Sequence, residues 1–164
     1  MTTPQSGISS ILFVCMGNIC RSPAGENVMR KMLQDAGLAD RIQVDSAGTH
    51  GYHIGHPPDS RMIDAGKLRG LPMTGAARKV TRNDLDQFDL ILAMDDGNYS
   101  ILTQLSTSTN LHKVKRFHEF YTRHTITEVP DPYYGSTKDF ELVLDLLEDG
   151  CAEIVRRIPQ GAIT

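Results

Sequence analysis

Short apolar stretches alternate along this chain with segments in which apolar residues recur at helical spacing. The apolar stretches cover residues 8–14, 41–45, 89–94 and 113–117. Parallel strands need long crossover connections, which are usually helices, so the alternation favours a parallel sheet covered by helices on both faces. We predict a three-layer α/β fold whose twisted sheet has about four parallel strands, with the last stretch at an edge.

Capping residues and apolar spacing place the helices between these strands. The first helix is expected to have Ser22 as its cap and Pro23 at its first position, and to stop near Gly37. A loop rich in glycine, histidine and proline follows over residues 46–58. Further helices are expected from Asp59 to Gly70, in a short turn at 81–84, over 95–105, and from Ser136 or Thr137 onward.

Length and composition bound the kind of protein. The 164 residues suit one domain, which we place at residues 8–164 after a disordered tail at 1–7. A net charge of −3 gives no general attraction for nucleic acid or anionic membranes, and no apolar run approaches the roughly 20 residues of a membrane span. With no secretory signal and only three cysteines, we expect a cytoplasmic monomer without a disulfide framework.

The segment from Cys15 to Ser22 joins the first predicted strand to the first predicted helix. A helix N-terminus presents free N–H groups and partial positive charge, and Gly17 and Asn18 can adopt the left-handed backbone that turns amides inward. Such a loop suits a phosphate dianion, and Arg21 can donate two hydrogen bonds to its oxygens. We therefore predict a phosphate-binding loop directly after the first strand.

Cys15 lies where the same positive field acts on a thiol. A cysteine near a helix N-terminus and an arginine is expected to be a thiolate at neutral pH, and a thiolate is an effective nucleophile. The Ser22 hydroxyl is close enough in sequence to hydrogen-bond the sulfur. The alternative is a buried cysteine followed by an unrelated arginine, since Cys-x5-Arg alone is a weak pattern. The strand before it, the Gly-Asn pair within it and the Ser-Pro pair after it favour a catalytic role.

Several segments in matching order make the chain resemble the low-molecular-weight protein tyrosine phosphatases. They are residues 14–23, 45–49, 55–59, 93–95 and 131–135. The resemblance covers nearly the whole chain and implies hydrolysis of phosphotyrosine and aryl phosphates through a cysteinyl-phosphate intermediate. It also implies that no metal or other cofactor takes part, and that phosphate or vanadate inhibits the reaction.

The resemblance assigns a role to each matched residue. Cys15 matches the nucleophile, Arg21 the phosphate clamp and Asp131 the general acid. An acid opposite the nucleophile helps a tyrosine to leave because it protonates the phenolate, whereas the simpler interpretation of Asp-Pro is a turn. Residues matched to substrate binding and loop support are Met16, Gly17, Asn18, Ile19, Cys20, Ser22, Ser46, Tyr52, Tyr133 and Tyr134. Within this set the resemblance makes the tyrosines the walls for an aryl ring, and the loop hydrogen bonds fall to Asn18, Ser22 and Ser46.

The two other cysteines and the tyrosine pair are considered separately. The resemblance matches Cys20 to a second loop cysteine that forms a reversible disulfide with Cys15, and simple burial is the alternative. Cys151 falls near the apolar face of the last helix, where we predict core packing. Whether Tyr133 and Tyr134 are themselves phosphorylated is left open.

One position departs from the family pattern, and one cluster invites a different chemistry. Many members carry a histidine where this chain has Gly75, so another group or a water must support the loop. His50, His53 and His56 recur every third residue, but the surrounding glycines and prolines exclude a helical face, and no cysteine or carboxylate cluster completes a zinc set. We expect these histidines on a solvated loop at the rim of the pocket.

Three other functions compete with phosphotyrosine hydrolysis. Arsenate reduction on this scaffold is expected to need further cysteines on a mobile loop, and residues 80–100 contain none. Phosphoarginine hydrolases tend to carry threonine where this chain has Ile19, and the tyrosine pair favours an aryl ester. A module that only binds phosphotyrosine needs neither a nucleophile nor an acid.

Overall fold

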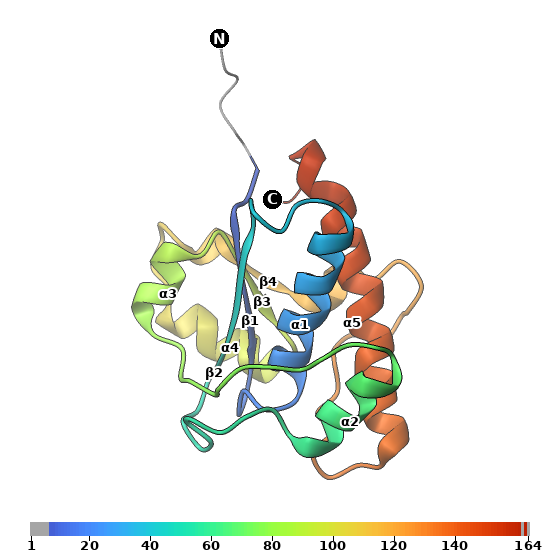
Figure 1. The fold of residues 1–164 in the computed structure, drawn as a ribbon. Coiled ribbons are helices and arrows are strands. Elements are labelled where there is room, and N and C mark those ends of the chain that lie inside the picture. Colours follow the sequence, from blue (N-terminus) through green and yellow to red (C-terminus); the bar gives the residue numbers. More distant parts are fainter. Residues whose placement is uncertain (1–6, 162, 164) are drawn as a thin grey trace.

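A parallel sheet forms the middle layer of the fold (Figure 1). In the computed structural model, which describes residues 7–161 and 163, its strands are β1 (Ser10–Cys15), β2 (Gln43–Gly48), β3 (Leu90–Ala93) and β4 (Val114–Arg116). The strand order is β2-β1-β3-β4, and each neighbouring pair runs parallel. The predicted parallel sheet is confirmed, with β4 at an edge. The predicted tail falls mostly on residues 1–6, which lie outside the described residues.

Helices cover both faces of this sheet (Figure 1). One face carries α1 (Arg21–Asp35) and α5 (Thr137–Arg157), with α2 (Ser60–Leu68) beside α5; the other carries α3 (Arg82–Gln87) and α4 (Asp96–Leu105). Short 3-10 turns occur at Leu111–Lys113, Phe117–Phe120 and Ile158–Gln160. The arrangement confirms the predicted three layers.

The alternation of side chains along β1 explains why the core has two parts. Ile11 and Phe13 belong to an apolar cluster shared with α1 and α5, whereas Leu12 and Val14 belong to a cluster shared with α3 and α4. All four side chains are fully buried. Because successive side chains of a strand point to opposite faces, a central strand covered on both faces needs a continuous apolar sequence.

The start of α1 differs from its prediction. Cys20 is the N-cap residue and makes no side-chain capping bond, so Ser22 lies within the first helical turn. The Ser22 hydroxyl contacts the sulfur of Cys15 instead of capping the helix. The predicted contact between this hydroxyl and the sulfur is therefore confirmed, and it replaces the predicted cap.

The second strand is also displaced from its prediction. It runs over Gln43–Gly48 rather than 41–45, so Ser46 lies in the strand and not in the following loop. Its pairing with β1 continues as far as the Cys15↔Gly48 partners. The neighbouring strand therefore extends β2 into a sequence whose serine and glycine do not favour a strand by themselves.

The other predicted helix starts are confirmed. The side chains of Asp59, Thr81 and Asp95 each accept a hydrogen bond from a backbone N–H group in the first turn of α2, α3 and α4. Ser136 is the N-cap of α5, and Cys151 on that helix is fully buried, as predicted. In the described part of the chain, no helix combines the length and the apolar character needed to cross a membrane.

The carboxyl ends of β1 and β3 lie side by side, which is where open α/β sheets bind ligands. Cys15 ends β1, and the loop into α1 follows it. Asp95 comes two residues after β3. The sheet therefore brings residues about 80 positions apart to one edge.

Candidate active site

Residues 16–20 turn from β1 into α1 and form the floor of the candidate site. Asn18 has a positive φ of 59°, a left-handed conformation that asparagine tolerates better than most residues. The Thr49 N–H donates to the Cys15 carbonyl at 2.8 Å and ties the loop to the end of β2. Gly48 permits this close approach, because a Cβ there would come within 2.8 Å of a loop carbonyl. We call residues 15–22 the cradle.

Cys15 holds its sulfur at the base of the cradle. Its Sγ lies 3.0 Å from the Ser22 Oγ and accepts a longer hydrogen bond from the Ser22 N–H at 3.4 Å. Only 2% of the residue is exposed, yet it lines the pocket described below. The Ser22 N–H at the start of α1 points toward the sulfur. The geometry suits a nucleophile that is screened from water and open toward a bound ligand.

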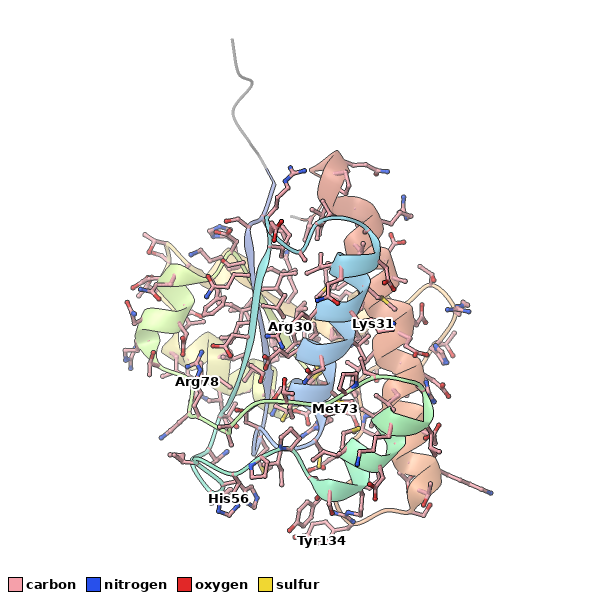
Figure 2. The ribbon with its side chains drawn as sticks, viewed as in Figure 1. Arg30, Lys31, His56, Met73, Arg78 and Tyr134 are labelled. Carbon is pink, nitrogen blue, oxygen red and sulfur yellow. The ribbon has the colours of Figure 1, made fainter. Side chains whose placement is uncertain are left out.

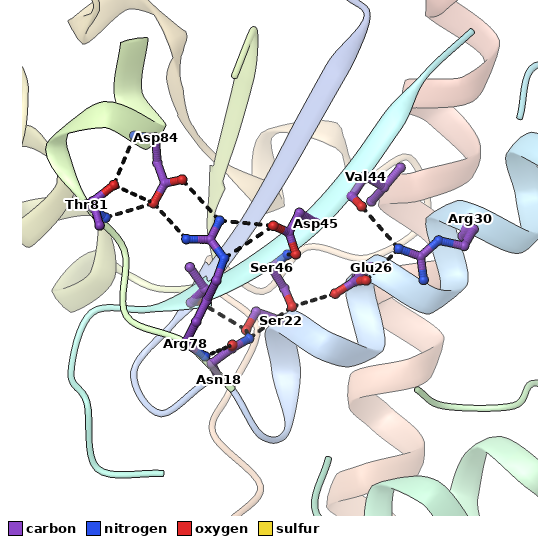
Figure 3. Close-up of polar contacts among 11 residues, drawn as sticks. Asn18, Ser22, Glu26, Arg30, Val44, Asp45, Ser46, Arg78, Thr81 and Asp84 are labelled. Carbon is purple, nitrogen blue, oxygen red and sulfur yellow. Dashed lines mark hydrogen bonds and ion pairs between the residues drawn. The ribbon is translucent and has the colours of Figure 1, made fainter. Parts of the chain in front are cut away.

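A chain of hydrogen bonds supports the cradle from behind (Figure 3). The Asn18 amide donates to Ser22 Oγ at 2.7 Å and to Ser46 Oγ at 3.0 Å. Ser46 in turn donates to the Glu26 carboxylate at 2.6 Å, and Glu26 pairs with Arg30 at 2.5 Å. Ser46 and Glu26 are buried, so loss of either partner leaves polar groups without water to replace it.

The same chain shows what supports the loop in the absence of a histidine at Gly75. The Asn18 Oδ1 accepts the backbone N–H of Arg78 at 2.9 Å, and Ser46 donates to Glu26. Gly75 itself has a φ of 129° and adjoins a small cavity of about 10 Å³, room for roughly one water molecule. The Arg78 side chain bridges Asp45 and Asp84, which fixes the segment that carries its N–H group (Figure 3).

Arg21 is buried beside the sulfur and held by partners from two other segments. Its Nη1 donates to Asp95 Oδ2 at 2.5 Å and to the Val129 carbonyl at 3.1 Å. Its Nη2 lies 3.7 Å from Asp131 Oδ2. Burial opposes the charge, but Cys15 and the two aspartates outweigh burial and raise the pKa of Arg21. A fixed guanidinium fork beside a phosphate loop is suited to an oxyanion.

The predicted catalytic residues converge on one pocket of about 310 Å³. The pocket is lined by Cys15, Met16, Gly17, Ile19, Cys20, Arg21, Tyr52, His53, Asp131, Tyr133 and Tyr134. Asp131 has a side chain 44% exposed, and its Oδ1 accepts the Tyr133 N–H at 3.1 Å. Of the predicted set, Asn18, Ser22 and Ser46 do not line the pocket and lie in the supporting chain instead.

Tyrosines and histidines form the rim of the pocket. The rings of Tyr133 and Tyr134 meet edge to face at 4.9 Å, and Tyr134 is 96% exposed. His50 stacks on Tyr52 at 5.1 Å, whereas His53 lines the pocket itself. Figure 2 shows Tyr134 and His56 at the end of the molecule where β1 meets α1. Among the described residues, no three His, Cys, Asp or Glu side chains gather closely enough to hold a metal ion.

Cys20 lies in the pocket wall with its thiol in a different setting from Cys15. Burial, together with the charges of Asp59 and Cys15, raises the pKa of Cys20 well above its usual range. The thiol is therefore protonated at neutral pH. Cys15 and Cys20 are both free in the structure, so their pairing stays a prediction.

Two residues of the site, Asp95 and Glu26, were absent from the predicted set. Asp95 fixes Arg21 and caps α4 through the Asn98 N–H at 2.8 Å. Its position after an apolar strand was the signal that could have found it, because that is where sheet edges place ligand-binding groups. Glu26 lies one helical turn after Ser22, a spacing that puts both on one face of α1. All three histidines were expected at the rim of the pocket, and the structure puts His53 in its lining.

The family model for low molecular weight phosphotyrosine protein phosphatase matches residues 10–161. The chain belongs to this family. The Bacillus subtilis low molecular weight protein-tyrosine-phosphatase YfkJ is 40% identical over 150 residues, which cover 91% of this chain and 95% of YfkJ. The human low molecular weight phosphotyrosine protein phosphatase is 42% identical over 140 residues, which cover 85% of this chain and 89% of the human protein.

A solved structure shows the same fold. The protein tyrosine phosphatase from Entamoeba histolytica, crystallised with Hepes in its active site, superposes with a TM-score of 0.93 and 43% identity. The superposition covers 94% of this chain and 99% of that protein. The α/β architecture and the family are thus established by independent comparisons.

Proposed function

We propose that this phosphatase hydrolyses phosphotyrosine and related aryl phosphates through a cysteinyl-phosphate intermediate. The observation that carries the proposal is the convergence of Cys15, Arg21 and Asp131 on one pocket with aromatic walls. A binding module needs a phosphate clamp, but it needs neither a buried sulfur at hydrogen-bond distance from a hydroxyl nor a carboxylate in the same pocket.

Binding of the substrate dianion falls to the cradle. The amides at the start of α1 and the Arg21 guanidinium surround the phosphate oxygens, where they also stabilise the charge that develops during transfer. Asp95 and the Val129 carbonyl hold one nitrogen of Arg21, so the guanidinium plane is fixed before substrate arrives. Tyr133 and Tyr52 flank the aryl ring of the substrate.

The first chemical step transfers the phosphoryl group to sulfur. The Cys15 thiolate attacks phosphorus, the S–P bond forms, and the bond from phosphorus to the phenolic oxygen breaks. Asp131 gives its proton to the departing oxygen, so the product leaves as a neutral phenol. The exposed carboxylate of Asp131 lines the same pocket as Cys15 and lies beside Arg21, which suits this transfer.

The second step regenerates the enzyme. Water attacks phosphorus, the Asp131 carboxylate accepts the proton of that water, and the S–P bond breaks to release inorganic phosphate. The Ser22 hydroxyl and N–H stabilise the sulfur as a leaving thiolate. Phosphate and vanadate act as inhibitors because they occupy the same oxyanion site. The monomeric state, the cytoplasmic location and the absence of nucleic-acid and membrane partners remain predictions from the sequence.

Turnover of para-nitrophenyl phosphate tests the proposal. We expect activity that persists in EDTA, is inhibited by vanadate, and is lost in Cys15→Ser while phosphate binding remains. Cys151→Ala is the matched control, because this cysteine is buried in the core far along α5 and takes no part in the steps above. Activity that survives Cys15→Ser would contradict the covalent step.

A second assay tests the substrate class. Phosphotyrosine and phosphoarginine are compared in peptides of otherwise identical sequence. We expect faster release of phosphate from the tyrosine peptide, because the rim tyrosines stack on an aryl ring and Asp131 assists an oxygen leaving group. Faster hydrolysis of phosphoarginine would overturn the assignment.

A further inference from the structure

Asp131 lies on a long connection between β4 and α5. We call residues 121–136 of this segment the acid connection. It has no strand pairing to hold it, and its tip is exposed around Tyr134. Whatever fixes its path therefore fixes where the carboxylate of Asp131 stands relative to Cys15 and Arg21.

A single carboxylate on α5, that of Asp149, accepts hydrogen bonds from the start of the acid connection. Asp149 accepts hydrogen bonds from the Thr122 N–H and hydroxyl, both at 2.9 Å, and from the Arg123 N–H at 3.1 Å. It also accepts from the His124 N–H at 3.0 Å and contacts His124 Nδ1 at 2.7 Å. Consecutive N–H groups aimed at one anion form a nest, which a helix side chain here occupies permanently.

The carboxylate of Asp149 is isolated from solvent. Its side chain is 0% exposed, and its charge is met by the donors of residues 122–124. Burial opposes the charge, but hydrogen bonds from Thr122, His124 and Arg123 outweigh burial and hold the pKa of Asp149 well below its usual range. Asp149 is therefore a carboxylate at neutral pH.

The far end of the acid connection is tied into the active site. The Tyr121 hydroxyl donates to the Glu128 carbonyl at 3.0 Å and closes residues 122–127 into a loop. The Val129 N–H donates to the Met94 carbonyl at 2.8 Å, and the Val129 carbonyl accepts from Arg21. Asp131 follows two residues later. The anchor at Asp149 and the site at Arg21 thus fix opposite ends of one short loop.

We propose that Asp149 is a positioning residue for the phosphatase reaction, which fixes the acid connection so that Asp131 stands over the leaving oxygen. The proposal rests on the role of Asp131 given above. Asp149 touches neither substrate nor reacting atoms, and it acts only through the backbone that carries Asp131. Removal of its charge frees residues 122–124, lets the carboxylate of Asp131 leave its working position, and leaves the cradle intact.

The leaving group of the substrate separates this role from a merely structural one. Protonation matters little for a phenolate that is already a good leaving group, and it matters greatly for a poor one. Loss of acid positioning therefore lowers kcat/KM for phenyl phosphate and spares dinitrophenyl phosphate. A general loss of folded enzyme lowers kcat/KM equally for both substrates.

The experiment compares both substrates in the parent, Asp149→Asn and Asp131→Asn, with inorganic phosphate as inhibitor. For Asp149→Asn we expect roughly a tenfold fall with phenyl phosphate, less than about twofold with dinitrophenyl phosphate, and an unchanged inhibition constant. Glu153→Gln is the matched control, because this carboxylate on the same helix pairs with Arg156 and Arg157 of α5 itself. Glu153→Gln should leave kcat/KM unchanged for both phenyl phosphate and dinitrophenyl phosphate.

Each outcome supports or overturns one proposal. If Asp131→Asn shows no dependence on the leaving group, the proposed role of Asp131 fails. If the loss of kcat/KM depends on the leaving group in Asp131→Asn but not in Asp149→Asn, only the positioning role of Asp149 is overturned. Should Asp149→Asn fail to fold, Thr122→Val and His124→Ala each remove one side-chain donor and keep the carboxylate. A fall of about twofold in kcat/KM for phenyl phosphate, with none for dinitrophenyl phosphate, supports the positioning role. If kcat/KM for phenyl phosphate falls in neither variant, the positioning role is rejected.

Discussion

The cradle and the acid connection reach the same pocket by different structural means. The cradle joins neighbouring elements, and Cys15 and Arg21 within it are each 2% exposed. The acid connection joins β4 to α5 without regular structure, and its Asp131 side chain is 44% exposed. The proposed nucleophile and phosphate clamp thus lie close together in sequence and are buried, whereas the proposed acid lies on an exposed segment whose contacts come from α5, from Met94 after β3 and from Arg21. We expect mutations in the two regions to separate phosphate binding from leaving-group chemistry.

The largest effect is expected from the clamp. In Arg21→Lys the ammonium cannot donate a fork of two hydrogen bonds to phosphate, and it cannot contact Asp95 and the phosphate together. We predict a fall in kcat/KM of roughly a thousandfold or more, with weaker inhibition by phosphate, measured by steady-state kinetics. Arg116→Lys, an exposed pair with Asp96, is the matched control. A fall in kcat/KM of less than about tenfold would show that a positive charge at this position is sufficient and that the two-nitrogen geometry of arginine is not needed.

Asp131→Asn is expected to have the second largest effect and to act on chemistry alone. The variant cannot protonate the leaving oxygen or accept a proton from water, so kcat with phenyl phosphate should fall roughly a hundredfold. Inhibition by phosphate should not weaken, because a carboxylate 3.7 Å from Arg21 is removed and no phosphate donor is lost. Rapid-quench measurement of the cysteinyl-phosphate, beside the inhibition constant, checks both parts. Weaker phosphate binding would mean that the two regions cannot be separated.

The contrast also explains which parts of the site the sequence could predict. Cys15, Arg21 and Ser22 fall within eight residues at a strand-to-helix junction, so local pattern and chemistry suffice to place them together. Glu26 was within reach of the same logic, since it follows Ser22 by one helical turn. The alternation of apolar segments likewise predicts the sheet and its two helical layers, because burial on both faces leaves its mark on the strands themselves.

Contacts between residues that lie far apart in the chain could not be predicted from the sequence in this way. Asp149 reads from the sequence as one more charge on an amphipathic helix, and only the fold brings it to residues 122–124. The loop support that replaces a histidine at Gly75 is a backbone N–H of Arg78, which no side-chain pattern can show. The wrong cap at Ser22 has a different origin, because the sequence allows its hydroxyl either to cap the helix or to contact the Cys15 sulfur, and the structure has the second contact.

The buried support of the cradle gives an intermediate effect. Asn18→Ala removes the amide that donates to the hydroxyls of Ser22 and Ser46, and it removes the side-chain oxygen that accepts the Arg78 N–H. We predict a loss of roughly 2–3 kcal/mol in the free energy of unfolding, measured with urea, and inhibition by phosphate weakened about tenfold. Asn110→Ala, another buried asparagine with side-chain partners outside the site, is the control that costs stability and spares phosphate binding. Equal phosphate binding in both variants would show that the hydrogen bonds of Asn18 stabilise the fold without supporting phosphate binding.

The smallest effect concerns acid stability, where the acid connection should be the weaker region. The pKa of Asp149 is lowered by folding, so its contribution is complete above the unfolded pKa of about 3.9 and is lost as pH falls toward the folded value. Asp149→Asn should therefore unfold more readily at neutral pH, by about 1–2 kcal/mol, and lose less stability than the parent on acidification. Urea midpoints, measured for both proteins from neutral pH down to below the unfolded pKa, test whether the stability difference shrinks as pH falls. Thr122→Val removes one donor and should flatten the curve only in part, whereas parallel curves for parent and Asp149→Asn would show that Asp149 does not contribute to the acid sensitivity.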